Sequence, residues 1–274
     1  MRVTVGTEPG RPGKENEDFA AVLPGAVVVI DGASAPPGLE PGCTHSVAWY
    51  ARTLGGLLAG AVTDHSSTLA EALESAIERV VLAHADTCDV GNPHSPSATV
   101  AVARARGDEL EYLVLADSTV LLARSDGEPL AVTDDRVETL RARIESLGEG
   151  PLLRGDTRVF SRLSRAEKIA AYRNHPDGFW VACTDPAAAR EALTGSLPLD
   201  EVRSVSVMTD GASRLVDLFG LRSWAGTLDI LDGEGPSGLI RRTREAEASD
   251  PDRTRWPRPK TRDDATAVHW ILSS

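Results

Sequence analysis

The sequence contains few cysteines and no long apolar run, and each absence excludes a class of protein. Its three cysteines, Cys43, Cys88 and Cys183, are odd in number and widely spaced, so we expect no disulfide framework and no cysteine pair at metal-ligand spacing. No apolar stretch approaches the length that spans a membrane, and residues 1–4 begin a strand-like segment rather than the apolar core of a signal peptide. We therefore expect a soluble protein in a reducing, cytoplasmic setting, with no membrane partner.

Basic residues are outnumbered as well. The chain has 29 Lys and Arg against 41 Asp and Glu, which gives a net charge of -12. A surface of that sign repels a nucleic-acid backbone, so we expect no nucleic-acid partner. Residues 253–262 are locally basic, but their prolines and Trp256 suit a loop better than a binding helix.

Internal repeats, low-complexity tracts and a glycine-rich phosphate-binding loop are also lacking. With 41% hydrophobic residues, the 274 residues are enough to bury a substantial core. We expect a single domain that spans residues 1–274. Residues 134–175 are helical in pattern but less apolar than the rest, so we expect them to form an excursion from that core.

Hydrophobic periodicity indicates an order of elements. β-Branched and alternating runs predict strands at residues 1–8, 19–23, 26–30, 98–105, 110–116, 120–124, 179–184, 203–209 and 265–272. Apolar residues at a 3.6-residue period and capping residues predict helices at residues 44–60, 69–84, 136–147, 164–172, 187–193, 221–231 and 237–248. Because the three strands within residues 98–124 are joined by short links, we expect them to be antiparallel neighbours. The order is that of an α+β protein, without the βαβ alternation of a parallel sheet.

Carboxylates stand at the ends of several of these strands. Residues 27–30 are four β-branched apolar residues, which predict a strand buried on both faces, and they lead directly into Asp31-Gly32. A charge at the end of a buried strand costs free energy unless a metal ion or a cation compensates it. Further strand-end carboxylates are Glu17, Asp18, Asp117, Asp210, Asp263 and Asp264. Together they favour an oxygen-rich metal centre.

Six short motifs, in this order, resemble those of the PPM-type metal-dependent phosphatases, the protein phosphatase 2C-like family. They are Asn16-Glu17-Asp18, Ile30-Asp31-Gly32, Ser97-Ala98-Thr99-Val100, Ala116-Asp117-Ser118, Thr209-Asp210-Gly211 and Asp263-Asp264-Ala265-Thr266. The resemblance implies a four-layer α-β-β-α sandwich of two antiparallel sheets flanked by helix pairs, with Mg²⁺ or Mn²⁺ between the sheet ends. Residues 134–175 would take the place of the family's variable flap.

The resemblance also implies roles for individual residues. Asp31 would bridge two Mg²⁺ or Mn²⁺ ions and Gly32 would contribute its carbonyl oxygen, so that a shared, activated water attacks phosphorus. The other implied ligands are Asp210 and Asp263 in the first site, Glu17 with the supporting Asp18 in the second, and Asp117 in a third, weaker site.

The chain departs from the family pattern at three functional positions, one of which is Ala33, where some members have a His that acts as a general acid. Members usually have a phosphate-binding Arg four residues before the position of Glu17, where this chain has Gly13. Arg11 and Lys14, in the same loop, are the candidate replacements, with Arg11 favoured because a guanidinium binds two oxygens at once; ordinary solvated loop charges are the alternative. Arg214 stands where many members have an Asp, which argues against a third metal.

Two further side chains lie near the predicted centre in the sequence. His45, at the start of the first predicted helix, is a candidate acid, with a partly buried structural histidine as the more ordinary interpretation. Cys43 has no neighbouring base that would mark a nucleophile.

The implied activity is hydrolysis of phosphoserine or phosphothreonine, so the expected partner is a phosphorylated protein. One alternative is a pseudophosphatase that acts as a regulatory metal-binding or protein-binding module, which Gly13 and Arg214 motivate. The retained carboxylates at Asp31, Asp210 and Asp263 argue against it, because buried carboxylates are costly without cations. The other alternative is a phosphatase of small metabolites, whose metal chemistry is the same.

Overall fold

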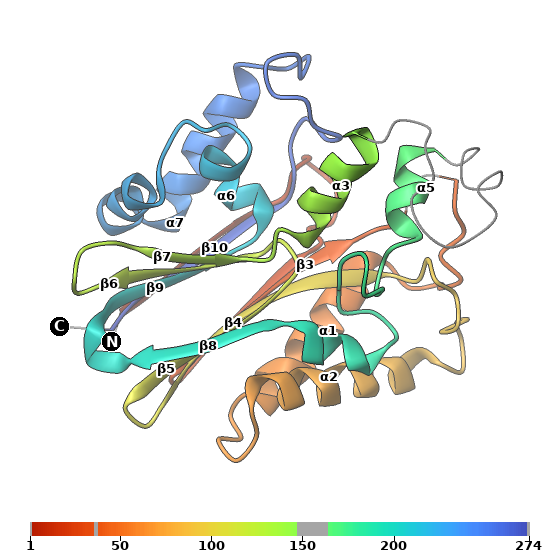
Figure 1. Cartoon of the computed structure of the whole chain (residues 1–274), viewed down its shortest axis with the longest axis horizontal. Helices are drawn as coiled ribbons and strands as arrows, with labels where there is room; N and C mark the ends of the chain where they lie inside the picture. The colour runs from red at the N-terminus through yellow and green to blue at the C-terminus, as the bar shows by residue number, and fades with distance from the viewer. Residues whose placement is uncertain (1, 36–37, 147–163, 273–274) are drawn as a thin grey trace.

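Two five-stranded sheets face each other in the computed structural model, and helices cover both outer faces (Figure 1). The structure describes residues 2–35, 38–146 and 164–272. The β10 sheet has the order β1-β10-β9-β6-β7 and the β3 sheet has the order β2-β3-β4-β5-β8, and the paired strands are antiparallel. The α+β four-layer sandwich implied by the resemblance is therefore confirmed.

The strands and helices have the following bounds. The strands are Arg2–Glu8 (β1), Asp18–Leu23 (β2), Ala26–Ala33 (β3), Ser97–Arg106 (β4), Glu109–Leu115 (β5), Thr119–Arg124 (β6), Leu130–Thr133 (β7), Leu193–Pro198 (β8), Val202–Met208 (β9) and Ala265–Ile271 (β10). The helices are Val47–Ala61 (α1), Leu69–His84 (α2), Arg136–Ser146 (α3), Arg165–Ala170 (α5), Asp210–Asp217 (α6) and Trp224–Ala248 (α7), with short 3₁₀ turns at Pro186–Glu191 (η1) and Leu199–Glu201 (η2).

Strand β3 is buried on both faces, as its β-branched run predicts. Val28 and Ile30 pack toward α1 and α2, whereas Val27 and Val29 belong to the core between the two sheets. Side chains alternate along a strand, so Asp31 lies on the same inner face as Val29. This alternation brings the carboxylate to the space between the sheets.

Several local predictions are wrong because pairing with distant strands overrides local pattern. Residues 179–184 form no strand and contribute single bridges, such as Ala98 with Ala182. The predicted helix at 187–193 is the 3₁₀ turn η1, and Leu193 instead begins β8 at the edge of the β3 sheet. The prediction of two helices, at residues 221–231 and 237–248, is confirmed: α7 begins at Trp224 and is interrupted where Gly235 adopts a φ of 71° before Pro236.

The connection between β5 and β6 differs from the prediction in an informative way. These strands are not neighbours: β5 pairs with β4 and β8, whereas β6 pairs with β9 and β7 in the other sheet. Ala116 adopts a φ of 66°, in the left-handed region, at the start of this crossover. Asp117 therefore lies on the short segment that connects the two sheets.

The predicted excursion at 134–175 is described only at its two ends, because residues 147–163 lie outside the described residues. Helix α3 contributes Val137, Leu140 and Ile144 to a small cluster with Tyr172, beside α5 at one end of the sandwich (Figure 1). The flap role and the single-domain organisation stay predictions. None of the described helices has the length and hydropathy needed to cross a membrane.

A buried arginine ties β4 to the turn between α1 and α2. The Arg104 guanidinium is fully buried and donates to Glu111 Oε2 at 2.6 and 2.8 Å and to the carbonyl oxygens of Val62, Asp64 and Ser67. Arg106, by contrast, pairs with Glu111 at 3.1 Å from a partly exposed position. The two arginines are thus matched in partner and differ in burial.

We expect Arg104→Met to lower the free energy of unfolding by about 3 kcal/mol or more, because it leaves three carbonyl groups and one oxygen of the Glu111 carboxylate without their donor. Arg106→Met should cost less than about 1 kcal/mol, as exposed ion pairs do. Urea unfolding curves of both variants test this. Equal losses would show that burial of Arg104 is not what matters.

Candidate metal centre

Two carboxylates face each other across the first hairpin of the β3 sheet. Asp18 and Asp31 are direct partners in the β2–β3 pairing, and both lie on the inner face. Asp18 is buried, and its Oδ2 accepts a hydrogen bond at 3.0 Å from Thr209 Oγ1, which follows β9 in the other sheet. The two sheets are therefore joined at this end by a polar contact at Asp18.

Burial and crowding raise the pKa values of these carboxyl groups. Burial raises the pKa of Asp18 to about 7, with the charges of Asp264 and Asp210 adding to it and hydrogen bonds from Thr266 and Thr209 opposing it. The pKa of Asp31 is raised well above its usual value, first by burial and then by its carboxylate neighbours. Those neighbours are Asp18, Asp210, Asp263 and Asp117.

The β5–β6 crossover and the start of α6 complete the cluster. Asp210 occupies the first turn of α6, and Asp117 lies on the crossover. Burial raises the pKa of Asp117 to about 7, and the Asp210 charge adds to it. Burial and the charge of Asp263 raise the pKa of Asp210, while Arg214 and Lys260 oppose the shift. The predicted ligands Asp18, Asp31, Asp117 and Asp210 thus come together from four separate segments.

Asp263 differs from the other predicted ligands because two cations already pair with it. Arg214 Nη2 lies 2.8 Å from Asp263 Oδ2, and Lys260 Nζ lies 2.6 Å from Asp263 Oδ1. The other side of the Arg214 guanidinium pairs with the buried Glu247 at 2.7 Å. Arg214 is buried, so this pair is well shielded from water. Arg214 therefore places a cation beside the acidic centre, as predicted, and its partners are Asp263 and Glu247.

Asp264, to which the sequence motif assigned no role, fixes the N-terminal loop. Its Oδ1 accepts from the backbone N–H of Gly10 and its Oδ2 from that of Glu17, both at 2.7 Å. The carbonyl oxygen of Glu17 in turn accepts from the N–H of Gly32 at 3.1 Å. This chain of contacts holds the residues around Glu17 against the end of β3.

The loop that carries the candidate phosphate-binding cations folds back as a tight turn. The N–H of Lys14 donates to the carbonyl oxygen of Arg11, and Gly13 adopts a φ of 79°. Lys14 Nζ pairs with Glu17 Oε1 at 3.0 Å. Arg11 is exposed, and within the described ranges its side chain pairs with no carboxylate. Lys14 thus lies beside the acidic cluster, and Arg11 lies on the same turn.

The residues of the cluster fit a hard divalent cation. One oxygen of the buried Asp18, Oδ1, has no hydrogen-bond partner among the residues that the structure describes, which is costly in a folded interior unless a ligand supplies the missing contact. The surrounding donors are carboxylate oxygens, which Mg²⁺ and Mn²⁺ prefer. A cation would offset the repulsion that raises the pKa values of the neighbouring carboxyl groups.

One expectation for the cysteines is wrong, and the fold also brings together two cysteines that are far apart in the sequence. Cys43 and Cys88 lie together, with their Sγ atoms 3.1 Å apart, although their sequence spacing gave no reason to pair them. Cys43 also has a base nearby, because His45 Nδ1 lies 3.7 Å from its Sγ. The Cys43-x-His45 spacing was the available signal; Cys88 joins them only through the fold.

We expect the metal-free protein, kept in a chelator, to lose stability as the pH rises from about 4 to about 7. The folded carboxyl groups of Asp18 and Asp117 keep their protons up to about pH 7, whereas the ordinary value is 3.8, so the folded state binds more protons in this window. The free energy of unfolding should fall by up to about 1.4 kcal/mol per pH unit for each such group.

Urea unfolding at a series of pH values measures this slope. Asp18→Asn should flatten it, and excess Mg²⁺ should remove it in the unaltered protein. A stability that stays level or rises over this window in chelator would contradict the interpretation.

Comparisons with known proteins agree with this geometry. The family model for protein phosphatase 2C matches residues 5–239, which ends before Asp263. A search of curated proteins found no match. Solved structures share the fold at low sequence identity, which by itself establishes the architecture alone.

Three of these structures are of bacterial phosphatases or a secretion regulator. The catalytic domain of the phosphatase PstP with two manganese ions is 16% identical, has a TM-score of 0.57, and covers 99% of this chain and 98% of its own. PppA, a regulatory component of the type VI secretion system in Pseudomonas aeruginosa, is 17% identical with a TM-score of 0.61 and coverages of 99% and 97%. Stp1 from Staphylococcus aureus is 12% identical with a TM-score of 0.59 and coverages of 100% and 96%. Because the family model matches most of the chain, this protein belongs to the protein phosphatase 2C family.

Proposed function

We propose that this protein is a metal-dependent phosphatase that hydrolyses phosphoserine and phosphothreonine in proteins with the help of two Mg²⁺ or Mn²⁺ ions. The observation that supports the proposal most is the convergence of Asp18, Asp31, Asp117 and Asp210 at one end of the sandwich, with raised pKa values. A protein keeps such a cluster at a cost to its stability unless cations bind there. Family membership supplies the reaction class.

Asp31 is the proposed bridging ligand. The pKa of Asp31 is raised by burial and by the charges of four other carboxylates, so this residue lies at the electrostatic centre of the cluster. The other proposed ligands are the Gly32 carbonyl oxygen, Asp210 and Asp263 for one ion, Glu17 and Asp18 for the second, and Asp117 for a weaker third. Bound there, the ions supply activation of water and neutralisation of charge on the phosphoryl group.

The surrounding residues hold these ligands in place. Thr209 donates to Asp18, Asp264 fixes the loop of Glu17, and Gly211 allows α6 to begin close to Asp264. A Cβ atom at Gly211 would lie 1.9 Å from the carbonyl oxygen of Asp264, so only glycine permits this approach. These contacts fix the ligand positions before any substrate arrives.

A phosphate dianion at the centre needs a cation from the protein in addition to the ions. We propose Arg11 for this role, because its guanidinium can bind two phosphate oxygens and no described carboxylate competes for it. Lys14 is the weaker candidate, since Glu17 already pairs with it.

The pairing of Asp263 favours a second candidate function, that of a pseudophosphatase. Arg214 and Lys260 occupy both oxygens of Asp263 and compete with any ion for this ligand. A centre in which these pairs persist would bind fewer ions and serve as a regulatory module. Mn²⁺ binding without hydrolysis of any phosphopeptide or small phosphoester would establish it, and activity confined to small phosphoesters would instead identify a metabolite phosphatase.

We expect Asp31→Asn to abolish hydrolysis of a phosphothreonine peptide with little loss of folded structure. The change removes the proposed bridging charge, so Mg²⁺ or Mn²⁺ should raise the melting temperature of the unaltered protein but not of the variant. Kinetic assays and thermal melts with and without metal measure both effects. Asp229→Asn, an exposed carboxylate on α7, is the matched control. Activity of Asp31→Asn within a few-fold of the unaltered enzyme would place the centre elsewhere.

We expect Arg11→Ala to lower kcat/KM for the phosphopeptide by roughly ten-fold or more, the scale of one charge-assisted contact. Lys14→Ala should have a smaller effect, because its ion pair with Glu17 reduces its availability. Steady-state kinetics at saturating Mn²⁺ separate the two. If an active enzyme is indifferent to both substitutions, the phosphate is bound by the ions alone and the proposed role of this loop is wrong.

A further inference from the structure

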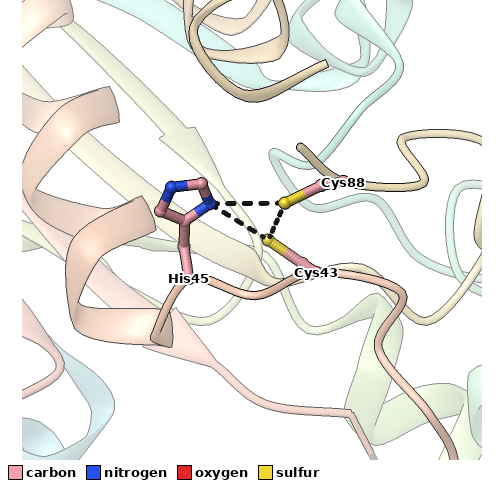
Figure 2. Close-up of side chains that lie close together, drawn as sticks. All are labelled: Cys43, His45 and Cys88. Atoms are coloured by element: carbon pink, nitrogen blue, oxygen red, sulfur yellow. Dashed lines mark hydrogen bonds between the residues drawn. The ribbon is translucent and has the colours of Figure 1, made fainter. Parts of the chain in front are cut away.

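A second group of potential metal ligands lies outside the acidic cluster. Cys43 and His45 belong to the loop between β3 and α1, and Cys88 follows the end of α2 (Figure 2). The Sγ atoms of the two cysteines lie 3.1 Å apart, and His45 Nδ1 lies 3.7 Å from Cys43 Sγ and 3.3 Å from Cys88 Sγ. All three side chains are partly accessible to solvent, so an ion can reach them.

Backbone contacts hold the two loops in register around this group. The N–H of Asp89 donates to the carbonyl oxygen of Gly42 at 2.8 Å. The N–H of Cys88 donates to the carbonyl oxygen of His84 at 3.0 Å. The His45 ring stacks on Trp49, with centroids 3.9 Å apart, which fixes its orientation. The three ligand atoms are therefore brought together by the fold itself.

Hydrogen bonds favour the thiolate of Cys88, the form that binds metals. The N–H of Thr44 donates to Cys88 Sγ at 3.4 Å. Burial opposes the thiolate, but hydrogen bonds from Cys43 and Thr44 outweigh it and lower the pKa of Cys88 to about 5. Burial and the contact with Cys88 raise the pKa of Cys43, and a bound cation would oppose this shift because metals bind the thiolate form.

The spacing of the three atoms suits tetrahedral coordination. Bonds of about 2.3 Å to sulfur and about 2.0–2.1 Å to imidazole nitrogen place tetrahedral ligand atoms roughly 3.5–3.8 Å apart. The observed 3.1, 3.3 and 3.7 Å need only small rotations of the side chains. A disulfide would need the sulfurs at about 2.05 Å, and both cysteines are free.

We propose that Cys43, His45 and Cys88 bind one Zn²⁺ ion, with a water molecule in the fourth position. Two sulfurs and an imidazole are the ligands of zinc, whereas Mg²⁺ and Mn²⁺ prefer the carboxylates of the acidic cluster. The protein would then hold two chemically distinct kinds of metal site. The proposal does not depend on phosphatase activity.

The zinc ion would join the start of α1 to the end of α2. Val47, in the first turn of α1, packs closely on Gly32. A Cβ atom added at Gly32 would lie 2.6 Å from Val47 Cγ1. Through this contact, an ion at Cys43 and His45 would stiffen the segment that follows Asp31. The ion would therefore act as a clamp between two loops, and its bound water would leave one coordination position open to exchange.

Cobalt and zinc binding to the reduced, untagged protein in excess Mg²⁺ tests the proposal. With Mg²⁺ on the carboxylates, Co²⁺ should give thiolate charge-transfer bands and the strong visible bands of a tetrahedral ion, and one Zn²⁺ per chain should displace it. Cys43→Ser and Cys88→Ser should each weaken Zn²⁺ binding by about a hundred-fold or more. Cys183→Ser, which alters the buried thiol outside the group, should leave the spectrum and the affinity unchanged.

A second measurement covers the case in which a variant fails to fold. In the unaltered protein, Zn²⁺ should slow alkylation of Cys43 and Cys88, followed by mass spectrometry of the peptides. Absence of charge-transfer bands, or alkylation of both cysteines at the same rate with and without Zn²⁺, would overturn the proposal. So would conversion of the pair to a disulfide together with failure of the reduced protein to take up Zn²⁺.

Discussion

Mutual repulsion among carboxylates buried between two sheets is the constraint on which the rest of the molecule depends. The apolar core between the sheets brings Val29 of β3 and Val207 of β9 together, and at its end the same inner face presents Asp31 and Thr209. Hydrophobic packing thus brings the carboxylates close together. Their burial and mutual repulsion disfavour the charged forms, which raises the pKa values. A divalent cation converts that cost into binding free energy, which is why the sandwich and the centre form one unit.

Most of the fold could be predicted from periodicity, because the central strands are buried and their apolar runs are long. The failures lie where local pattern is weak. Strand β8 contains Gly195 and Pro198 and exists only because the edge of β5 is available for pairing. Helix α6 has eight residues and begins at Asp210 itself. The Asp-Gly motif there indicated the end of a strand, so the helix was not predicted. The sequence could not predict that β5 and β6 belong to different sheets, because a short link is compatible with both a crossover between sheets and a hairpin.

The carboxylates of the candidate centre could be predicted from the sequence, but the residues that pair with them could not. Asp-Gly pairs after buried strands mark Asp31 and Asp210 directly. The ion pairs of Asp263 were not predictable, because the orientation of Arg214 depends on Glu247, which lies 33 residues further along in another helix. The meeting of Cys88 with Cys43 likewise depends on how α2 ends against the β3–α1 loop, which no local pattern encodes.

The hydrogen bonds of Asp264 have a consequence for how the chain matures during synthesis. They join this residue to the backbone of Gly10 and Glu17, across sequence separations of 254 and 247 residues. The first loop of the protein therefore remains without its anchor until Asp264 has left the ribosome. A nascent chain can assemble the β3 sheet and its helices early, yet it can complete the proposed metal centre only after the segment around Asp264 has emerged.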